Sequence, residues 1–189
     1  MSMRRHLIVA FGAVFLLPLV VALGQNGRVS KKTFTLGEST VVCSVKTFDP
    51  PVTMKRDSAA SDQGNAIRCS RLFYGLLAEG DIEAAAALSN DPEKTKKKFE
   101  RQQKRVGEEE FAAMFRAYFG GTVTVKYLFA LGTHEMLILH DPQMGMDMAQ
   151  FYEVVDGKRL VDEQESADRT KLAGLFGTLK NDDGILKIE

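Results

Sequence analysis

The stretch VTVKYLFALGTHEMLILHDPQMGMDMAQFYEVVDGKRLVD, residues 123–162, decides the fold of this chain, because its apolar residues follow the two-residue period of β-strands. In residues 123–131, apolar side chains at alternate positions would cover one face of a strand. The pair Asp156-Gly157 is typical of a two-residue hairpin turn. The stretch therefore predicts an antiparallel sheet with three further strands, over residues 134–140, 148–155 and 159–162.

The residues before this stretch follow the 3.6-residue period of amphipathic helices instead. A helix over residues 66–79 carries a stripe of apolar side chains and ends at Gly80, and a short alanine-rich helix follows it. Asp91 and the proline after it begin a basic helix, and another helix is expected over residues 108–119. Helices followed by antiparallel strands predict an α+β domain.

The N-terminal residues 1–24 have the pattern of a secretory signal peptide. Arg4 and Arg5 precede an uncharged apolar run over residues 7–23, and small residues lead to a cleavage site after Gly24. The run is slightly shorter than the about 20 apolar residues that a spanning helix needs. We therefore expect export, with a periplasmic or secreted protein after cleavage near Gly24. An uncleaved segment would instead attach the protein to a membrane.

The composition of the mature chain excludes some function classes. Removal of residues 1–24 leaves 165 of the 189 residues and a formal charge of −2, because the segment carries two basic residues and no acidic ones. A nearly neutral surface does not favour binding to nucleic acid. The length fits one domain. We expect this domain over residues 65–165, after an extension over residues 25–64 with one strand and a loop, and before a tail helix over residues 166–189.

The chain contains two cysteines, Cys43 and Cys69. Cys43 lies on a strand expected over residues 40–48, and Cys69 lies on the helix over residues 66–79. An even number of cysteines in an exported protein favours a disulfide bond, and this bond could contribute about 3 kcal/mol to stability. The alternative is a pair of buried free thiols. The spacing is not that of a redox-active C-x-x-C motif.

Three segments carry a resemblance to a known superfamily: RLFYGLLAEGDIEAAAALS (71–89), EEEFAAMFRAYF (108–119) and AQFYEVVDGKRLVDEQ (149–164). They resemble the NTF2-like (cystatin-like) superfamily. The resemblance implies a curved antiparallel sheet that wraps around N-terminal helices as a cone and leaves a pocket at one end. It implies no single activity, because the superfamily includes isomerases, dehydratases and non-enzymatic binding or dimerising domains. Leu160 stands where many relatives have tryptophan, and residues 25–60 lie outside the resemblance.

Acid–base catalysis would require a carboxylate whose pKa is raised by an apolar pocket, together with a polar partner for a developing oxyanion. Glu153 is a candidate base because it lies in the middle of an expected strand, and Asp141 is a second candidate. Tyr127 could donate a hydrogen bond to the oxyanion. No residue matches an isomerase motif position by position. The candidate residues for a ligand pocket are aromatic: Tyr74, Phe119 and Tyr152.

A methionine-rich loop offers a candidate copper site. Met144, Met146 and Met148 follow His140 at alternate positions, and sulfur and imidazole ligands of this kind select Cu(I). The alternative is that these methionines fill gaps in the core or adapt to a binding surface. His134 and His140 would lie about 20 Å apart on one strand, so we do not expect them to share a metal ion.

These observations favour an exported binding or interaction module without catalytic activity. A small apolar ligand could occupy a pocket, or two copies could form a homodimer through the sheet face, because residues 148–155 are apolar on both faces. No cofactor is expected. The alternatives are a small pocket enzyme of the isomerase, dehydratase or hydrolase type with a carboxylate base, and a periplasmic copper binder.

Overall fold

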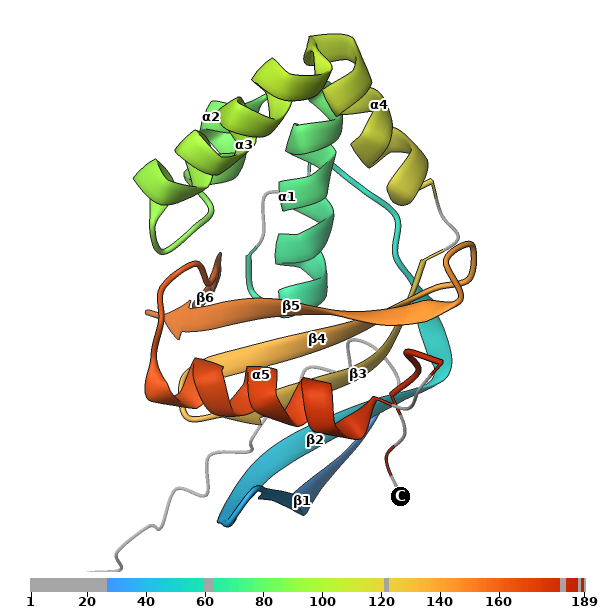
Figure 1. Ribbon diagram of the computed structural model, residues 1–189, viewed down its shortest axis with the longest axis vertical. Helices are drawn as coiled ribbons and strands as arrows, with labels where there is room; N and C mark the ends of the chain where they lie inside the picture. Colours follow the sequence, from blue (N-terminus) through green and yellow to red (C-terminus); the bar gives the residue numbers. More distant parts are fainter. Residues whose placement is uncertain (1–26, 60–62, 121–122, 181–182, 187, 189) are drawn as a thin grey trace, which may run out of the picture.

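The computed structural model describes residues 27–59, 63–120, 123–180, 183–186 and 188. In these residues, six strands form an antiparallel sheet in the spatial order β1-β2-β3-β4-β5-β6, and five helices pack with it (Figure 1). This arrangement confirms the α+β class. The strands are β1 (Arg28–Leu36), β2 (Ser39–Thr53), β3 (Thr124–Leu131), β4 (His134–Asp141), β5 (Met146–Val155) and β6 (Lys158–Val161). The helices are α1 (Ala66–Glu79), α2 (Ile82–Ala86), α3 (Pro92–Val106), α4 (Glu108–Tyr118) and α5 (Ala167–Leu179).

The expected signal peptide, residues 1–24, lies outside the described residues. Among the residues that are described, no helix combines the length and the apolar character needed to cross a membrane.

Local sequence signals explain where several elements begin and end. The Asn65 side chain caps α1 by accepting a backbone N–H hydrogen bond at 3.0 Å, and Gly80 ends this helix with a φ of 85°. Asp91 caps α3 in the same way. Asp156 and Gly157 both have positive φ, 50° and 79°, as the hairpin turn between β5 and β6 requires. These ends agree with the expectations from the sequence.

The N-terminal extension differs from the expectation of one strand and a loop. Residues 25–64 contain two strands, and the β1–β2 hairpin joins the main sheet because β2 pairs with β3. The second strand also continues through Asp49-Pro50-Pro51, where the sequence predicts an end. Lys31 belongs to a polar, basic strand at the edge of the sheet, and such residues protect an edge from unwanted pairing.

Two register shifts change which side chains of β2 and β3 share a face. The pairing of β2 with β3 shifts within residues 47–52, and the pairing of β3 with β4 shifts between Val125 and Tyr127. Val125 therefore packs in the core cluster next to α1, whereas Phe129 packs in the cluster next to α5. The expectation that alternate residues over 123–131 cover one face is wrong here, because a β-bulge reverses the alternation.

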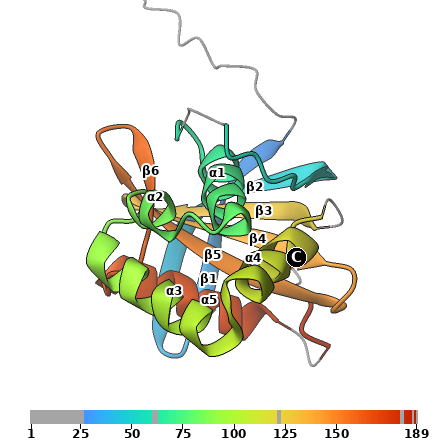
Figure 2. The ribbon, with the colours of Figure 1, turned by 90° about the horizontal axis from the view of Figure 1, so that it is seen from above.

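Helices cover both faces of the sheet. Cys69 of α1 packs on one face in a cluster with Leu137 of β4, and Leu172 of α5 packs on the other face with Ile138. Figure 1 shows α1–α4 above the sheet and α5 in front of it, and Figure 2 shows the same layers from above. The face that residues 148–155 offered to a second copy is therefore covered in part by α5.

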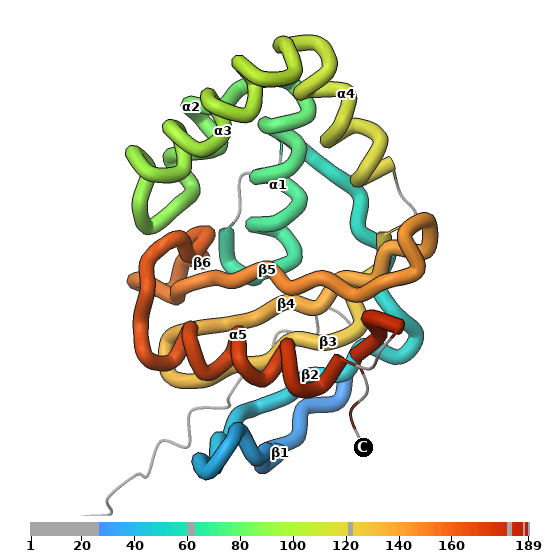
Figure 3. The backbone as a smooth tube through the Cα atoms, viewed as in Figure 1, coloured from blue at the N-terminus to red at the C-terminus, as the bar shows by residue number. Residues whose placement is uncertain are grey.

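The C-terminal segment closes part of the free edge of β5 (Figure 3). The backbone N–H of Asp147 donates to the carbonyl oxygen of Gly184 at 3.0 Å, and Leu186 N donates to Asp147 Oδ2 at 2.8 Å. The buried Asp147 carboxylate also accepts hydrogen bonds from Lys126 and His140. The carboxylate thus attaches the end of the chain to the sheet.

The disulfide bond expected between Cys43 and Cys69 is not present. Both cysteines are free and buried. Cys43 of β2 belongs to the core cluster next to α5, and Cys69 of α1 belongs to the cluster on the opposite face, so the sheet separates the two sulfur atoms. Burial raises the pKa of Cys43 to about 11 and that of Cys69 to about 12.

We predict that both thiols are inert in the folded protein and reactive after unfolding. At pH 8 a pKa of about 11 or 12 leaves almost no thiolate, which is the form that attacks a disulfide reagent. Titration with Ellman's reagent, without prior reduction, should detect almost no thiol in the native protein and two thiols per chain in guanidinium chloride. Detection of no thiol after unfolding would contradict this.

We predict that α5 is required for stability. Leu175 is fully buried against the sheet, so Leu175→Ala should lower the free energy of unfolding by about 3 kcal/mol through lost burial and a residual cavity. The matched control is Lys171→Ala on the exposed side of the same helix, which should change stability by less than about 0.5 kcal/mol. Urea denaturation measures both. Equal effects of the two substitutions would show that α5 is not docked.

Candidate functional site

A cavity of about 290 Å³ lies at the edge of the sheet, where β6 ends and β5 continues. Its walls come from α1 and α3 on one side and from β5 and the loop after β6 on the other. The cavity is slightly smaller than typical ligand sites, which range from about 300 to 1,000 Å³. Its position between helices and an open strand edge makes it the best candidate for a ligand site in the described part of the chain.

Aromatic side chains form the helical wall of the cavity. Phe73 and Tyr74 of α1 meet edge to face with ring centroids 5.2 Å apart, and Phe99 of α3 lies 5.8 Å from Phe73. Tyr74 also stacks on Phe119 at 3.9 Å. Burial raises the pKa of Tyr74 well above its ordinary value, so its phenol stays neutral. This wall suits an apolar or aromatic ligand group.

One strand residue gives the cavity a polar floor. The Oε1 atom of Gln150 accepts hydrogen bonds from Ser70 Oγ at 2.6 Å and from the hydroxyl of Tyr152 at 2.8 Å. Burial raises the pKa of Tyr152 far above its ordinary value, so this hydroxyl remains a donor. Because both donors hold the oxygen atom of the Gln150 amide, its NH₂ group is oriented as the donor available to a ligand.

Two cations and two carboxylates are among the residues that line the cavity. Lys98 Nζ donates to Glu163 Oε1 at 2.7 Å. Arg169 lies 3.8 Å from a carboxylate oxygen of Asp162, donates to the backbone oxygen of the same residue at 3.3 Å, and sits over the ring of Phe151. The charges balance within the site, so it does not favour a ligand with a large net charge of either sign.

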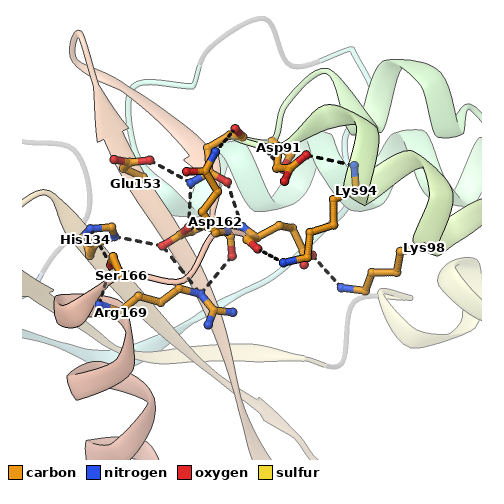
Figure 4. Close-up of polar contacts among 12 residues, drawn as sticks. Asp91, Lys94, Lys98, His134, Glu153, Asp162, Ser166 and Arg169 are labelled. Carbon is orange, nitrogen blue, oxygen red and sulfur yellow. Dashed lines mark hydrogen bonds and ion pairs between the residues drawn. The ribbon is translucent and has the colours of Figure 1, made fainter.

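Asp162 is the centre of a buried polar network beside the cavity (Figure 4). Its side chain is 3% exposed, and it accepts a hydrogen bond from Asn90 Nδ2 at 2.7 Å and lies 3.0 Å from His134 Nδ1. The same Asn90 nitrogen donates to Glu153 at 2.9 Å, and Asn90 Oδ1 accepts from the backbone N–H of Glu163. The network joins the loop before α3, the start of β4 and the loop after β6.

Ser166, His134 and Asp162 are connected in the order of a nucleophile, a base and an orienting acid. Ser166 Oγ lies 3.1 Å from His134 Nε2, and Asp162 lies at the other ring nitrogen. Ser166 Oγ also caps α5 by accepting the backbone N–H of Arg169 at 3.1 Å. The cavity is lined by Asp162 and Arg169 but not by His134 or Ser166. We therefore assign the histidine and serine to positioning α5.

The three residues expected for acid–base catalysis do not come together. Glu153 pairs with His134 at one end of β4, and Asp141 lies at the other end, about 23 Å away at the usual strand rise. Asp141 accepts the backbone N–H groups of the turn that follows it. Tyr127 packs in the core cluster next to α5. None of these residues lines the cavity. Of the three expected pocket residues, Tyr74 and Tyr152 line it and Phe119 does not.

The methionine-rich segment begins in a turn and continues into β5. Met144 is 52% exposed, Met146 begins β5, and Met148 packs in the core cluster next to α1, where the Tyr118 hydroxyl contacts its sulfur. The nearby His140 pairs with Asp147. Among the described residues, no group of three or more His, Cys, Asp or Glu side chains could hold a metal ion. The Cu(I) site of methionine and histidine ligands stays a prediction.

Sequence reasoning missed the polar half of the site, which is formed by Asn90, Lys98, Gln150, Asp162 and Arg169. Gln150 carries one available signal, because it is an uncharged polar residue inside a strand that has apolar residues on both faces. The others come from helices and loops, and no periodic pattern marks them.

Comparisons of the chain with protein-family models, with curated proteins and with solved structures found no match. The resemblance to the NTF2-like superfamily therefore has no support from these comparisons and stays a prediction.

We predict that Asp162 holds the site together. Asp162→Ala removes the buried carboxylate that Asn90 and His134 share, and it should lower the free energy of unfolding by about 3 kcal/mol. The control is Glu165→Ala in the same loop, where the exposed side chain should contribute less than about 0.5 kcal/mol. Urea denaturation measures both. A loss below about 1 kcal/mol for Asp162→Ala would show that the network is dispensable.

Proposed function

We propose that this protein is an exported, NTF2-like binding module that holds a small ligand in the cavity at the edge of β5. One observation carries the proposal: aromatic side chains line one wall of the cavity, and Gln150, Lys98 and Arg169 converge on it from other elements. An apolar wall with a few oriented polar groups is the usual composition of a ligand site. Export rests on the pattern of residues 1–24.

The NTF2-like part of the proposal rests on the order and packing of the elements. Four helices precede four consecutive antiparallel strands, and α1 packs against the sheet they form. The resemblance implies a pocket at one end of the cone, and the cavity lies between the helices and the edge of the sheet. The β1–β2 hairpin and α5 add to this arrangement, and α5 covers the second face of the sheet.

The described contacts favour binding over catalysis. Asp162 and Glu163, the carboxylates at the cavity, are both occupied by hydrogen bonds or ion pairs, and the expected bases Glu153 and Asp141 lie outside it. The Ser166 hydroxyl serves as a helix cap. A homodimer remains a separate proposal, for which the exposed Val29 and Val42 on the β1–β2 hairpin offer apolar surface.

A fragment screen of the mature protein tests the proposed site. Small aromatic compounds that carry one polar group should shift the backbone amide NMR signals of residues 149–152. Arg169→Gln should weaken the best compound at least about threefold, because a cation at the cavity is lost. The matched control, Arg105→Gln on an exposed part of α3, should leave the affinity unchanged. Compounds that bind without shifting residues 149–152, or an absence of binding, would overturn the proposal.

A further inference from the structure

At Ala149, the outer edge of β5 is not paired with another strand. We call this unpaired stretch the opening, and it lies in the cavity. One edge of β5 pairs with β4 from Met146 to Glu153. On the other edge, β6 pairs only with residues 152–155. The cavity is lined by Ala149 and the three residues that follow it, so it includes the part of β5 that β6 leaves uncovered.

The backbone N–H and C=O groups of Ala149 point to this outer edge. Phe151 O accepts the N–H of Asp162 at 2.9 Å, and Asp147 N donates to Gly184 O at 3.0 Å, so both residues direct these groups away from β4. Residues two apart in a strand direct their backbone groups to the same edge. Ala149 lies between them, and none of the hydrogen bonds of the described residues outside the β4–β5 pairing uses its N–H or C=O.

The opening has closed ends. The loop after β6 occupies the edge at Phe151, and the C-terminal segment occupies it at Asp147. A long strand from another protein would collide with one of these segments. A ligand residue whose N–H and C=O belong to two successive amide groups and point to the same side could pair with Ala149, as an added strand does in peptide-binding domains.

We propose that the ligand is a peptide of three residues with free ends, and this inference rests on the proposed binding function. The N–H and C=O of its middle residue pair with the C=O and N–H of Ala149. Directly paired residues share a face and Ala149 packs toward α5, so it is an apolar side chain of a flanking residue that lies against the aromatic wall of Phe73 and Phe99. The terminal carboxylate lies near Lys98 and Arg169 and the terminal amine near Glu163, because a zwitterion matches a site whose charges balance.

The first experiment uses the tripeptide Ala-Ala-Phe and its depsipeptide analogue, in which an ester oxygen replaces the N–H of the middle alanine. The ester removes one donor and weakens the neighbouring acceptor while it preserves size and end charges. Calorimetry should show about tenfold weaker binding of the analogue. Amide hydrogen exchange measured by NMR should slow at least about tenfold at Ala149 when the tripeptide binds.

The second experiment changes the protein. Ala149→Pro removes the N–H that faces the opening, and proline is tolerated where the N–H of a strand points away from its neighbour. It should weaken the tripeptide about tenfold, and the matched control Ala149→Ser, which retains the N–H, should bind as the unchanged protein does. If Ala149→Pro fails to fold, the comparison of the tripeptide with its ester analogue, made with the unchanged protein, still tests the peptide inference.

The outcomes separate this inference from the proposed function. Equal affinity for the tripeptide and its ester, with unchanged exchange at Ala149, would overturn the peptide inference. Binding of aromatic fragments in the cavity without binding of Ala-Ala-Phe would overturn it too, while the ligand site itself would stand. Failure of fragments and peptide alike would overturn both.

Discussion

Burial of β4 on both faces is the constraint on which the rest of the structure depends. Residues 134–139 are buried without interruption, although successive side chains of a strand point to opposite faces. Two helical layers are therefore required, α1 with its neighbours on one face and α5 on the other. The register shift in β3 places Val125 and Phe129, which ordinary alternation would put on one face, in opposite layers.

Burial on both faces leaves the ends and the edge of the sheet as the places for polar groups. At one end of β4, His134 meets Asp162, and at the other end His140 meets Asp147. Each aspartate is buried and holds a segment that is distant in sequence, Asn90 in the first case and Leu186 in the second. The cavity lies beside the first of these junctions, so its walls are held by the same hydrogen bonds that stabilise the fold.

The sequence predicts the elements better than it predicts the site. Caps such as Asn65 and Asp91 act within one helical turn, so helix ends can be read locally. The first strand was missed because its polar, basic residues suit an edge and show no apolar alternation. The hydrogen bond from Asn90 to Asp162 spans 72 positions, and nothing local encodes such a pair.

The position of the last elements has a consequence for how the chain folds during synthesis. The second face of the sheet is covered by α5, and the edge at Asp147 is closed by Gly184, so both coverings are made late. Ser44 of β2 also cannot pair with Ala130 of β3 until β3 has been synthesised. During synthesis from the N-terminus, the sheet therefore exposes an apolar face and an unpaired edge until α5 and the segment at Gly184 have been made. Exposed surfaces of this kind favour aggregation, which chaperones counteract. Cooperative folding, once α5 and Gly184 are available to the sheet, is the route that this topology favours.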